Sequence, residues 1–347
     1  MLQAAKRHAK DIRAGLLAES RSRRSNLQVK QETTGRGYPD ELADLLVTID
    51  RAFEALDMPA LERALEQSLH IRERGGLGRP ASMIAANRVS EHLELVCGKD
   101  RLQPEGASDL KAQLLRWTQR APHSPYAQAT LANYYATLGH AYRGTGWARD
   151  VSREDADMFM RLGQAAQQVF NQSWAHCHTN WYWVLAWSGS DISAGADISE
   201  VWRRFHKRVT TNTFCPSAYW TMSIRLLPRW FGDYRQLDDF IVRSSETAKH
   251  ICGDGLYAML YTNLLEFEEI EDLHLDGERL EASVFDWLRY TPTDQSRCYL
   301  AGSLFETQRL DACQTVIESI EILYTHYWTA EHELNLVNSI CREWTGR

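Results

Sequence analysis

The densest group of side chains that could bind a metal ion is His176, Cys177 and His178. Imidazole nitrogens and a thiolate sulfur are common ligands of Zn²⁺. We expect this segment to be helical, however, and consecutive residues of a helix point about 100° apart, so the three side chains cannot all face one ion. No companion motif supplies the missing ligands. The sequence therefore predicts no metal site and no cofactor, and assigns these residues to packing.

Other patterns with a chemical meaning are incomplete. Glu271 and His274 have the E-x-x-H spacing of carboxylate-bridged di-iron bundles, but that architecture needs two such motifs and further glutamates on facing helices. The glycines of residues 75–80 follow no predicted strand, so a phosphate-binding loop is not indicated. No G-x-S-x-G nucleophile motif is present. We predict no catalytic residues.

Acidic residues concentrate between Glu266 and Asp286, where one arginine, Arg279, stands among nine carboxylates. Such a run is either a solvated face or a surface that steers a basic protein partner. The partner hypothesis places four of these residues in contact with the partner: Glu268, Glu269, Glu271 and Asp272.

Aromatic residues mark the middle of the chain, since eight of the twelve tryptophans lie between residues 147 and 230. Most of these rings must fill the space between helices. A subset, Trp183 and Tyr219, could line a concave groove that binds a protein segment, because buried aromatic anchors dominate such interfaces. The rival hypothesis is an enzyme or small-ligand binder with its polar groups in this groove: Arg143, Glu154, His176 and His178.

The composition narrows the class of protein. With 44% hydrophobic and 24% charged residues, the chain is typical of a globular protein, and its net charge of −7 argues against nucleic-acid binding. No apolar run reaches the roughly 18 residues that span a bilayer. Seven scattered cysteines without a C-x-x-C pair favour reduced thiols in the cytoplasm.

Helical periodicity is the main structural signal. Leu42, Leu45, Leu46 and Ile49 form one apolar stripe, and a second stripe follows Pro59, which predicts a helical hairpin that turns at Asp57. We predict further helices over residues 81–96, 107–120, 127–140, 154–170, 175–187, 199–209, 216–227, 233–250, 257–267, 278–290, 308–324 and 328–344. No segment alternates apolar and polar residues over enough positions to predict a strand. The expected fold is all-α, a helical-hairpin array of the degenerate tetratricopeptide-like α-solenoid type.

Three regions are expected along the chain. Residues 1–37 form a basic arm with nine Lys or Arg and three acids, either solvated and disordered or a docking helix. RNA binding through this arm is a third alternative, which would require affinity to fall steeply with salt. Residues 38–122 form an N-terminal helical region, and residues 123–347 an aromatic-rich helical-repeat region that continues from it.

The segment 215–250 predicts two helices joined by a tight corner. Pro228 should end the first helix, because proline lacks a backbone donor and clashes with the preceding turn. Gly232 then supplies a stop, and Asp233 can cap the next helix through its carboxylate. Arg229 and Trp230 complete this structural corner.

The sequence Leu226-Leu227-Pro228-Arg229-Trp230-Phe231-Gly232-Asp233 resembles the L-L-P-R-W-G-G-D-type corner of a bacterial family of unknown function, with Phe231 in place of the first glycine. Residues 141–148 and the helix after them are similar to that family's other characteristic segment. The resemblance covers roughly residues 105–270. It implies tetratricopeptide-like helical pairs and carries no activity.

These observations together predict a non-catalytic, cytoplasmic bacterial protein that binds another protein, without a role for membrane or nucleic acid. One specific version is an immunity or antitoxin-like inhibitor whose acidic face occludes a basic toxin, and an adaptor is another. The enzyme or small-ligand binder stays the alternative.

Overall fold

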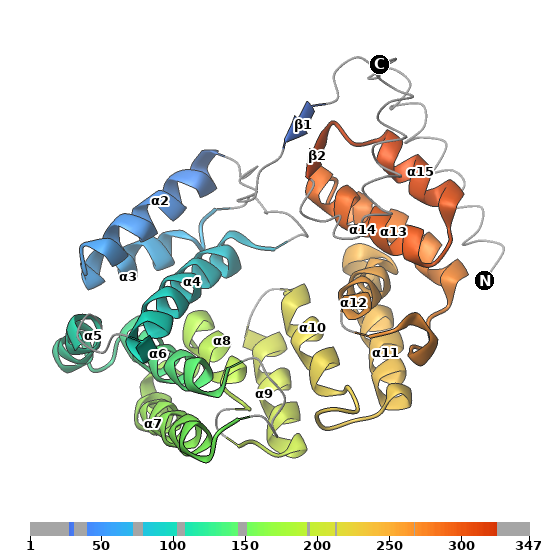
Figure 1. Cartoon of the computed structure of the whole chain (residues 1–347). Helices are drawn as coiled ribbons and strands as arrows, with labels where there is room; N and C mark the ends of the chain where they lie inside the picture. Colours follow the sequence, from blue (N-terminus) through green and yellow to red (C-terminus); the bar gives the residue numbers. More distant parts are fainter. Residues whose placement is uncertain are drawn as a thin grey trace. The chain divides into compact units, whose positions relative to one another are not determined.

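The computed structural model describes residues 28–30, 40–71, 79–102, 108–144, 151–192, 195–211, 214–266 and 268–324. Helices dominate this part of the chain, so the expected all-α class is confirmed (Figure 1). The helices are α2 (Asp40–Glu54), α3 (Met58–Gln67), α4 (Ala81–Leu102), α5 (Ser108–Arg120), α6 (Pro125–Arg143), α7 (Arg153–Cys177), α8 (Trp181–Gly189), α9 (Ile198–Thr211), α10 (Pro216–Arg225), α11 (Tyr234–Cys252), α12 (Gly255–Leu265), α13 (Gly277–Tyr290), α14 (Asp294–Glu306) and α15 (Leu310–Glu318).

The chain divides into two compact units. The described residues of the N-terminal unit lie within 40–71 and 79–218, and those of the C-terminal unit lie within 219–324 and include residues 28–30. The division falls inside α10. Position 123, where the aromatic-rich region was expected to begin, lies within the N-terminal unit.

Helix α6 organises the N-terminal unit, because it contacts α4, α5, α7 and α8. Its buried face is built largely from small residues, Ala127, Ala129, Ala132 and Gly139, which allow neighbouring helices to approach closely. A Cβ atom added at Gly139 would lie 3.4 Å from the Phe159 carbonyl oxygen of α7. The helix begins where the Ser124 hydroxyl accepts a hydrogen bond from the Ala127 N–H.

Helix α12 occupies the centre of the C-terminal unit, since residues 255–264 are all buried. Two glycines allow α12 to be buried in this way. Gly253 adopts the left-handed conformation with φ 59°, and a Cβ atom at Gly255 would lie 2.7 Å from the backbone of Trp287. The turn between α11 and α12 can therefore pass directly against α13.

The structure differs from the sequence-based expectations in several elements. Residues 154–177 lie in one helix, α7, and the break before α8 comes at Asn180, whose side chain accepts bonds from the Tyr182 and Trp183 N–H groups. Helix α14 was not predicted at all. The helix expected over residues 308–324 ends at Glu318, and the one expected over residues 328–344 lies outside the described residues.

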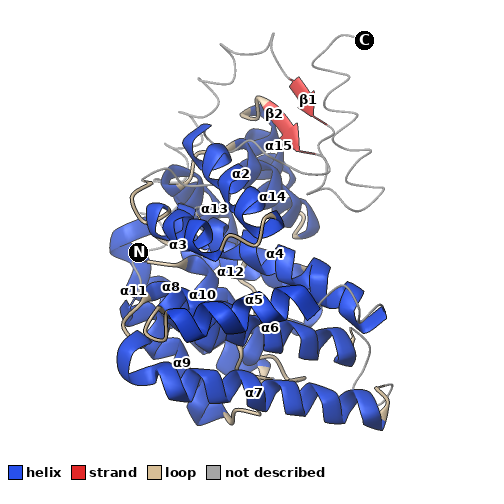
Figure 2. Cartoon of the chain, turned by 90° about the vertical axis from the view of Figure 1, so that its left-hand side faces the viewer, coloured by secondary structure: helices blue, strands red, loops and turns tan. Residues whose placement is uncertain are grey.

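A short β element also appears, which was expected neither in the basic arm of residues 1–37 nor at the end of the helix predicted over residues 308–324. Strand β1 (Gln28–Lys30) pairs in parallel with β2 (Ile322–Tyr324), with Val29 opposite Leu323 (Figure 2). The two strands are three residues each, and they leave the all-α class of the described chain unchanged.

Candidate protein-interaction surface

The corner between α10 and α11 is a tightly closed turn. Helix α10 ends at Arg225, before Pro228, and the Phe231 N–H then bonds back to the Arg225 carbonyl at 3.1 Å. A Cβ atom at Gly232 would collide with the backbone carbonyl of Leu226, so no larger residue fits without a shift of the chain. Asp233 caps α11 by accepting a 2.8 Å hydrogen bond from the Gln236 N–H.

Glu268 fastens the acidic segment to this corner. The Arg229 Nη2 atom lies 2.6 Å from Glu268 Oε1, and the Tyr234 hydroxyl donates a 2.7 Å hydrogen bond to Glu268 Oε2. The Glu268 carboxylate accepts this bond and, with burial, raises the pKa of Tyr234 to about 12. The Glu268 side chain is only 10% exposed. Its predicted role as a partner contact is therefore corrected: both carboxylate oxygens already hold Arg229 and Tyr234, and we call this arrangement the corner latch.

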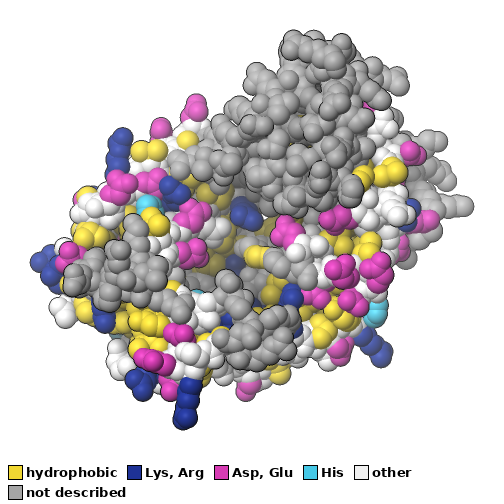
Figure 3. Space-filling model, in the orientation of Figure 1, with side chains coloured by type: hydrophobic (Ala, Val, Ile, Leu, Met, Phe, Trp, Pro, Cys, Tyr) yellow, Lys and Arg dark blue, Asp and Glu magenta, His cyan; other side chains and the backbone are white. Residues whose placement is uncertain are grey.

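The residues after Glu268 present their carboxylates to solvent. Glu269, Glu271 and Asp272 are exposed around a short 3-10 turn, η3 (Ile270–Asp272), while the following Leu273 is buried and anchors the segment. Within the described part of the chain, none of the three forms an ion pair with a basic side chain. We call these three residues the acidic surface, and Figure 3 shows acidic side chains gathered over this part of the C-terminal unit.

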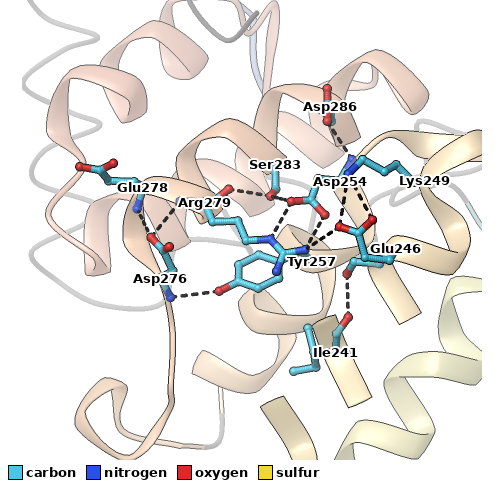
Figure 4. Close-up of polar contacts among 11 residues, drawn as sticks. Ile241, Glu246, Lys249, Asp254, Tyr257, Asp276, Glu278, Arg279, Ser283 and Asp286 are labelled. Atoms are coloured by element: carbon cyan, nitrogen blue, oxygen red, sulfur yellow. Dashed lines mark hydrogen bonds and ion pairs between the residues drawn. The ribbon is translucent and has the colours of Figure 1, made fainter. Parts of the chain in front are cut away.

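Arg279, the one arginine of the acidic run, is occupied inside the fold (Figure 4). Its guanidinium donates two hydrogen bonds to the Asp254 carboxylate, at 2.7 and 2.8 Å, and lies 4.2 Å from the centre of the Tyr257 ring. These hydrogen bonds to Asp254 raise the pKa of Arg279. The guanidinium is therefore committed to Asp254 and Tyr257, which leaves the acidic surface with its negative charge.

The same network joins α12 to α13, and the Arg279 guanidinium also lies 3.9 Å from Glu246 Oε1 of α11. The Asp254 N–H donates a 2.8 Å bond to Asp286 Oδ2, and the Asp276 N–H donates a 3.0 Å bond to the Tyr257 hydroxyl (Figure 4). Asp276 also caps α13 by accepting bonds from the Glu278 and Arg279 N–H groups. The Ser283 hydroxyl lies 3.4 Å from Asp254 Oδ2, but it donates a shorter 2.6 Å bond to the Arg279 carbonyl, and the Asp254 carboxylate is held by Arg279. We therefore assign this network to stabilising the structure.

Of the two aromatic residues that were expected to line a groove, one lies in the core. Trp183 is 0% exposed; its Nε1–H donates a 2.9 Å hydrogen bond to the Ser173 hydroxyl, and its ring packs edge-on against Phe170. The prediction that Trp183 contacts a partner is thus wrong, because the ring is core. Tyr219, in the C-terminal unit, is half-buried, with its ring centre 6.5 Å from that of Phe240.

Two polar groups of the enzyme hypothesis, Glu154 and His176, lie far apart. Glu154 and His176 belong to the same helix, α7, and their separation of 22 residues corresponds to about 33 Å along the helix axis. His178 packs against Trp174, with its Nδ1 atom 2.9 Å from the Trp174 carbonyl oxygen. A hollow on α7 is lined by amides, without an ionisable group: Gln164, Gln167, Gln168, Asn171 and Gln172.

The described residues also bear on metal binding and on membrane insertion. No group of three or more His, Cys, Asp or Glu side chains is arranged to hold a metal ion there. Similarly, none of the described helices combines the length and the apolar character required to cross a bilayer.

Comparison of the chain with protein-family models, curated proteins and solved structures finds no match. The resemblance of residues 226–233 to the corner of a bacterial helical-pair family stays a prediction.

Proposed function

We propose that this protein binds a basic segment of another protein through the acidic surface, Glu269, Glu271 and Asp272. The observation that carries the proposal is three exposed carboxylates that have no basic partner among the described residues, on a segment held firmly at both sides. Unneutralised charge of one sign attracts a partner of the other sign and accelerates association.

The surface is held in place before a partner arrives. On one side the corner latch fixes Glu268, and on the other Asp276 is fixed by its bonds to α13 and to Tyr257. Fixing a binding segment in advance reduces the conformational entropy that binding would otherwise cost. This favours a recognition role over a merely solvated face.

An aromatic side chain lies in the same corner. Trp230 is 38% exposed, and it directly follows Arg229, which is bonded to the acidic segment. The Arg225 guanidinium already lies 5.8 Å from the centre of its ring, so the ring accepts a cation at this distance. We include Trp230 in the proposed interface as a residue that a lysine or arginine of the partner can contact.

An inhibitor of a basic toxin, as in immunity and antitoxin proteins, and an adaptor both fit this surface chemistry. A bacterial cytoplasm is the proposed location. It fits six described thiols that are buried and form no disulfide. The small-ligand alternative gains no support, because Trp183 lies in the core and Glu154 and His176 lie far apart along α7.

The test is a pull-down from native lysate that compares the intact protein with a Glu269→Lys/Glu271→Lys/Asp272→Lys variant. A matched control, Glu41→Lys/Asp44→Lys/Glu54→Lys, makes the same change of charge at exposed residues of α2. We expect a basic protein that is retained by the intact chain and by the control and lost by the acidic-surface variant. Equal capture by all three proteins, or no specific capture, would refute the proposal.

A further inference from the structure

Two histidines that are far apart in the sequence lie against each other on the N-terminal unit. The ring centres of His123 and His176 are 4.2 Å apart and the rings are tilted by 57°. His123 belongs to the turn between α5 and α6, and His176 to the last turn of α7. Both side chains are exposed, so each ring can reach solvent and rotate about its side-chain bonds.

The surroundings of this pair favour a cation. His176 lies at the carboxyl end of a 25-residue helix, where the partial negative charge of the helix dipole stabilises positive charge. The Glu62 carboxylate is brought beside the turn by a 2.9 Å hydrogen bond from the Ser124 hydroxyl, next to His123. Arg120, three residues before His123, is the nearest basic residue in the sequence, and its positive charge disfavours a cation there.

The two neighbouring candidates for ligands are engaged elsewhere. The His178 ring is stacked on Trp174 and its Nδ1 atom contacts the Trp174 carbonyl oxygen. The Cys177 thiol is buried and contacts the His123 carbonyl oxygen at 3.8 Å, so it does not face solvent beside the two rings. His123 and His176 are therefore the two side chains of this group that remain available as ligands, and among the described residues no group of three or more His, Cys, Asp or Glu side chains is arranged around a common ion.

We propose that His123 and His176 together bind one borderline divalent cation of the Zn²⁺ and Cu²⁺ class, with water in the remaining coordination positions. Neutral imidazole is a preferred ligand of these ions, whereas Mg²⁺ and Ca²⁺ require oxygen ligands. The open positions can also accept a side chain from another molecule. This site is separate from the acidic surface and does not depend on the proposed function.

The experiment uses the full chain, stripped of metal with a chelator, and Zn²⁺ as the probe in calorimetry. We expect one saturable site per chain. His123→Gln and His176→Gln should each weaken Zn²⁺ binding by at least about tenfold, the lower end of the loss seen when even an outer-shell partner of a metal ligand is removed. His178→Gln and His206→Gln are matched controls that should keep the affinity of the intact protein.

A spectroscopic readout identifies the ligands directly. With Cu²⁺, the electron paramagnetic resonance spectrum of the intact protein should show coupling to two imidazole nitrogens, and to one in each single variant. Equal unfolding temperatures in chelator would show that all variants are folded, as expected for exposed positions. Zn²⁺ binding that is unchanged in the His123→Gln/His176→Gln double variant, or no saturable binding by the intact chain, would overturn the proposal.

Discussion

At the scale of single residues, side chains of the same type have different roles in this fold. Glu268 and Glu269 are adjacent carboxylates of the same acidic run, yet the first is held by Arg229 and Tyr234 and the second is exposed. Burial and pairing, which depend on residues far along the chain, decide which of them is structural.

Replacement of Glu268 and Glu269 by glutamine should therefore have different effects. Glu268→Gln weakens two charge-assisted hydrogen bonds and should lower the free energy of unfolding by about 1–2 kcal/mol. Glu269→Gln should change it by less than about 0.5 kcal/mol, as for most surface substitutions. Urea denaturation of both variants measures the difference. Equal stabilities would show that the corner latch does not contribute in solution.

Gly232 offers a second comparison at this scale. Gly232→Ala places a methyl group against the Leu226 carbonyl and should cost about 1–3 kcal/mol of folding free energy, as overpacking does. The control is Gly98→Ala in α4, where nothing lies within 4 Å of the new atom and alanine favours the helix by up to about 1 kcal/mol. Denaturation midpoints should move in opposite directions. A stable Gly232→Ala protein would argue against the tight corner.

At the scale of elements, charged pairs that join two helices are more buried than a charged pair on one exposed helix. The bond between Arg279 and Asp254 joins α13 to the start of α12, and both side chains are about three-quarters buried, at 24% and 22% exposure. Lys249 and Glu246, by contrast, are neighbours on α11 and more than half exposed.

A double-mutant cycle on Arg279→Met and Asp254→Asn should give a coupling energy of about 1–2 kcal/mol, within the range for residues in direct contact. The same cycle on Lys249→Met and Glu246→Gln should give less than about 0.5 kcal/mol, as for exposed helical pairs. Chemical denaturation of the single and double variants measures both couplings. Similar values for the two pairs would contradict the assigned role of Arg279.

Sequence periodicity predicts elements well where one face is buried. The stripes of α2 and α3 and the cap at Asp233 can be read locally, because each depends on residues within one or two turns. Helix α14 was missed because its buried residues surround the helix and mix leucine with serine and glutamine, which leaves no periodic stripe. The β1–β2 pair joins segments about 300 residues apart, which no local pattern can reveal.

The same limit applies to the candidate sites. An acidic surface can be predicted from composition, but the partner of Glu268 lies 39 residues earlier in the chain, at Arg229. Trp183 was misplaced because an aromatic residue suits a core and a binding groove equally well. His123 and His176 are 53 residues apart, so their contact arises only from the packing of α6 on α7.

At the scale of the whole molecule, the cysteines report on the integrity of the fold. The six described cysteines, three in each unit, are buried: Cys97, Cys177, Cys215, Cys252, Cys298 and Cys313. Burial raises the pKa of Cys252 to about 11, which also suppresses its reactive thiolate.

A Cys341→Ser variant, which removes the cysteine outside the described residues, should react with a chromogenic thiol reagent only slowly under native conditions. All six thiols should become reactive in denaturant. Reaction kinetics at increasing denaturant measure how each unit opens. Rapid labelling of several thiols in the native protein would contradict the packing described here.

The corner latch has a consequence for mapping any binding site on this protein. Because Arg229 and Tyr234 hold the backbone that carries the acidic surface, alanine substitutions at these two positions should weaken partner binding even if neither side chain touches the partner. An alanine scan that measured only partner affinity would therefore identify Arg229 and Tyr234 as binding hot spots. Hydrogen exchange of the amides of residues 269–273 in the unbound variants would separate the two explanations, since a displaced segment exchanges faster before any partner is added.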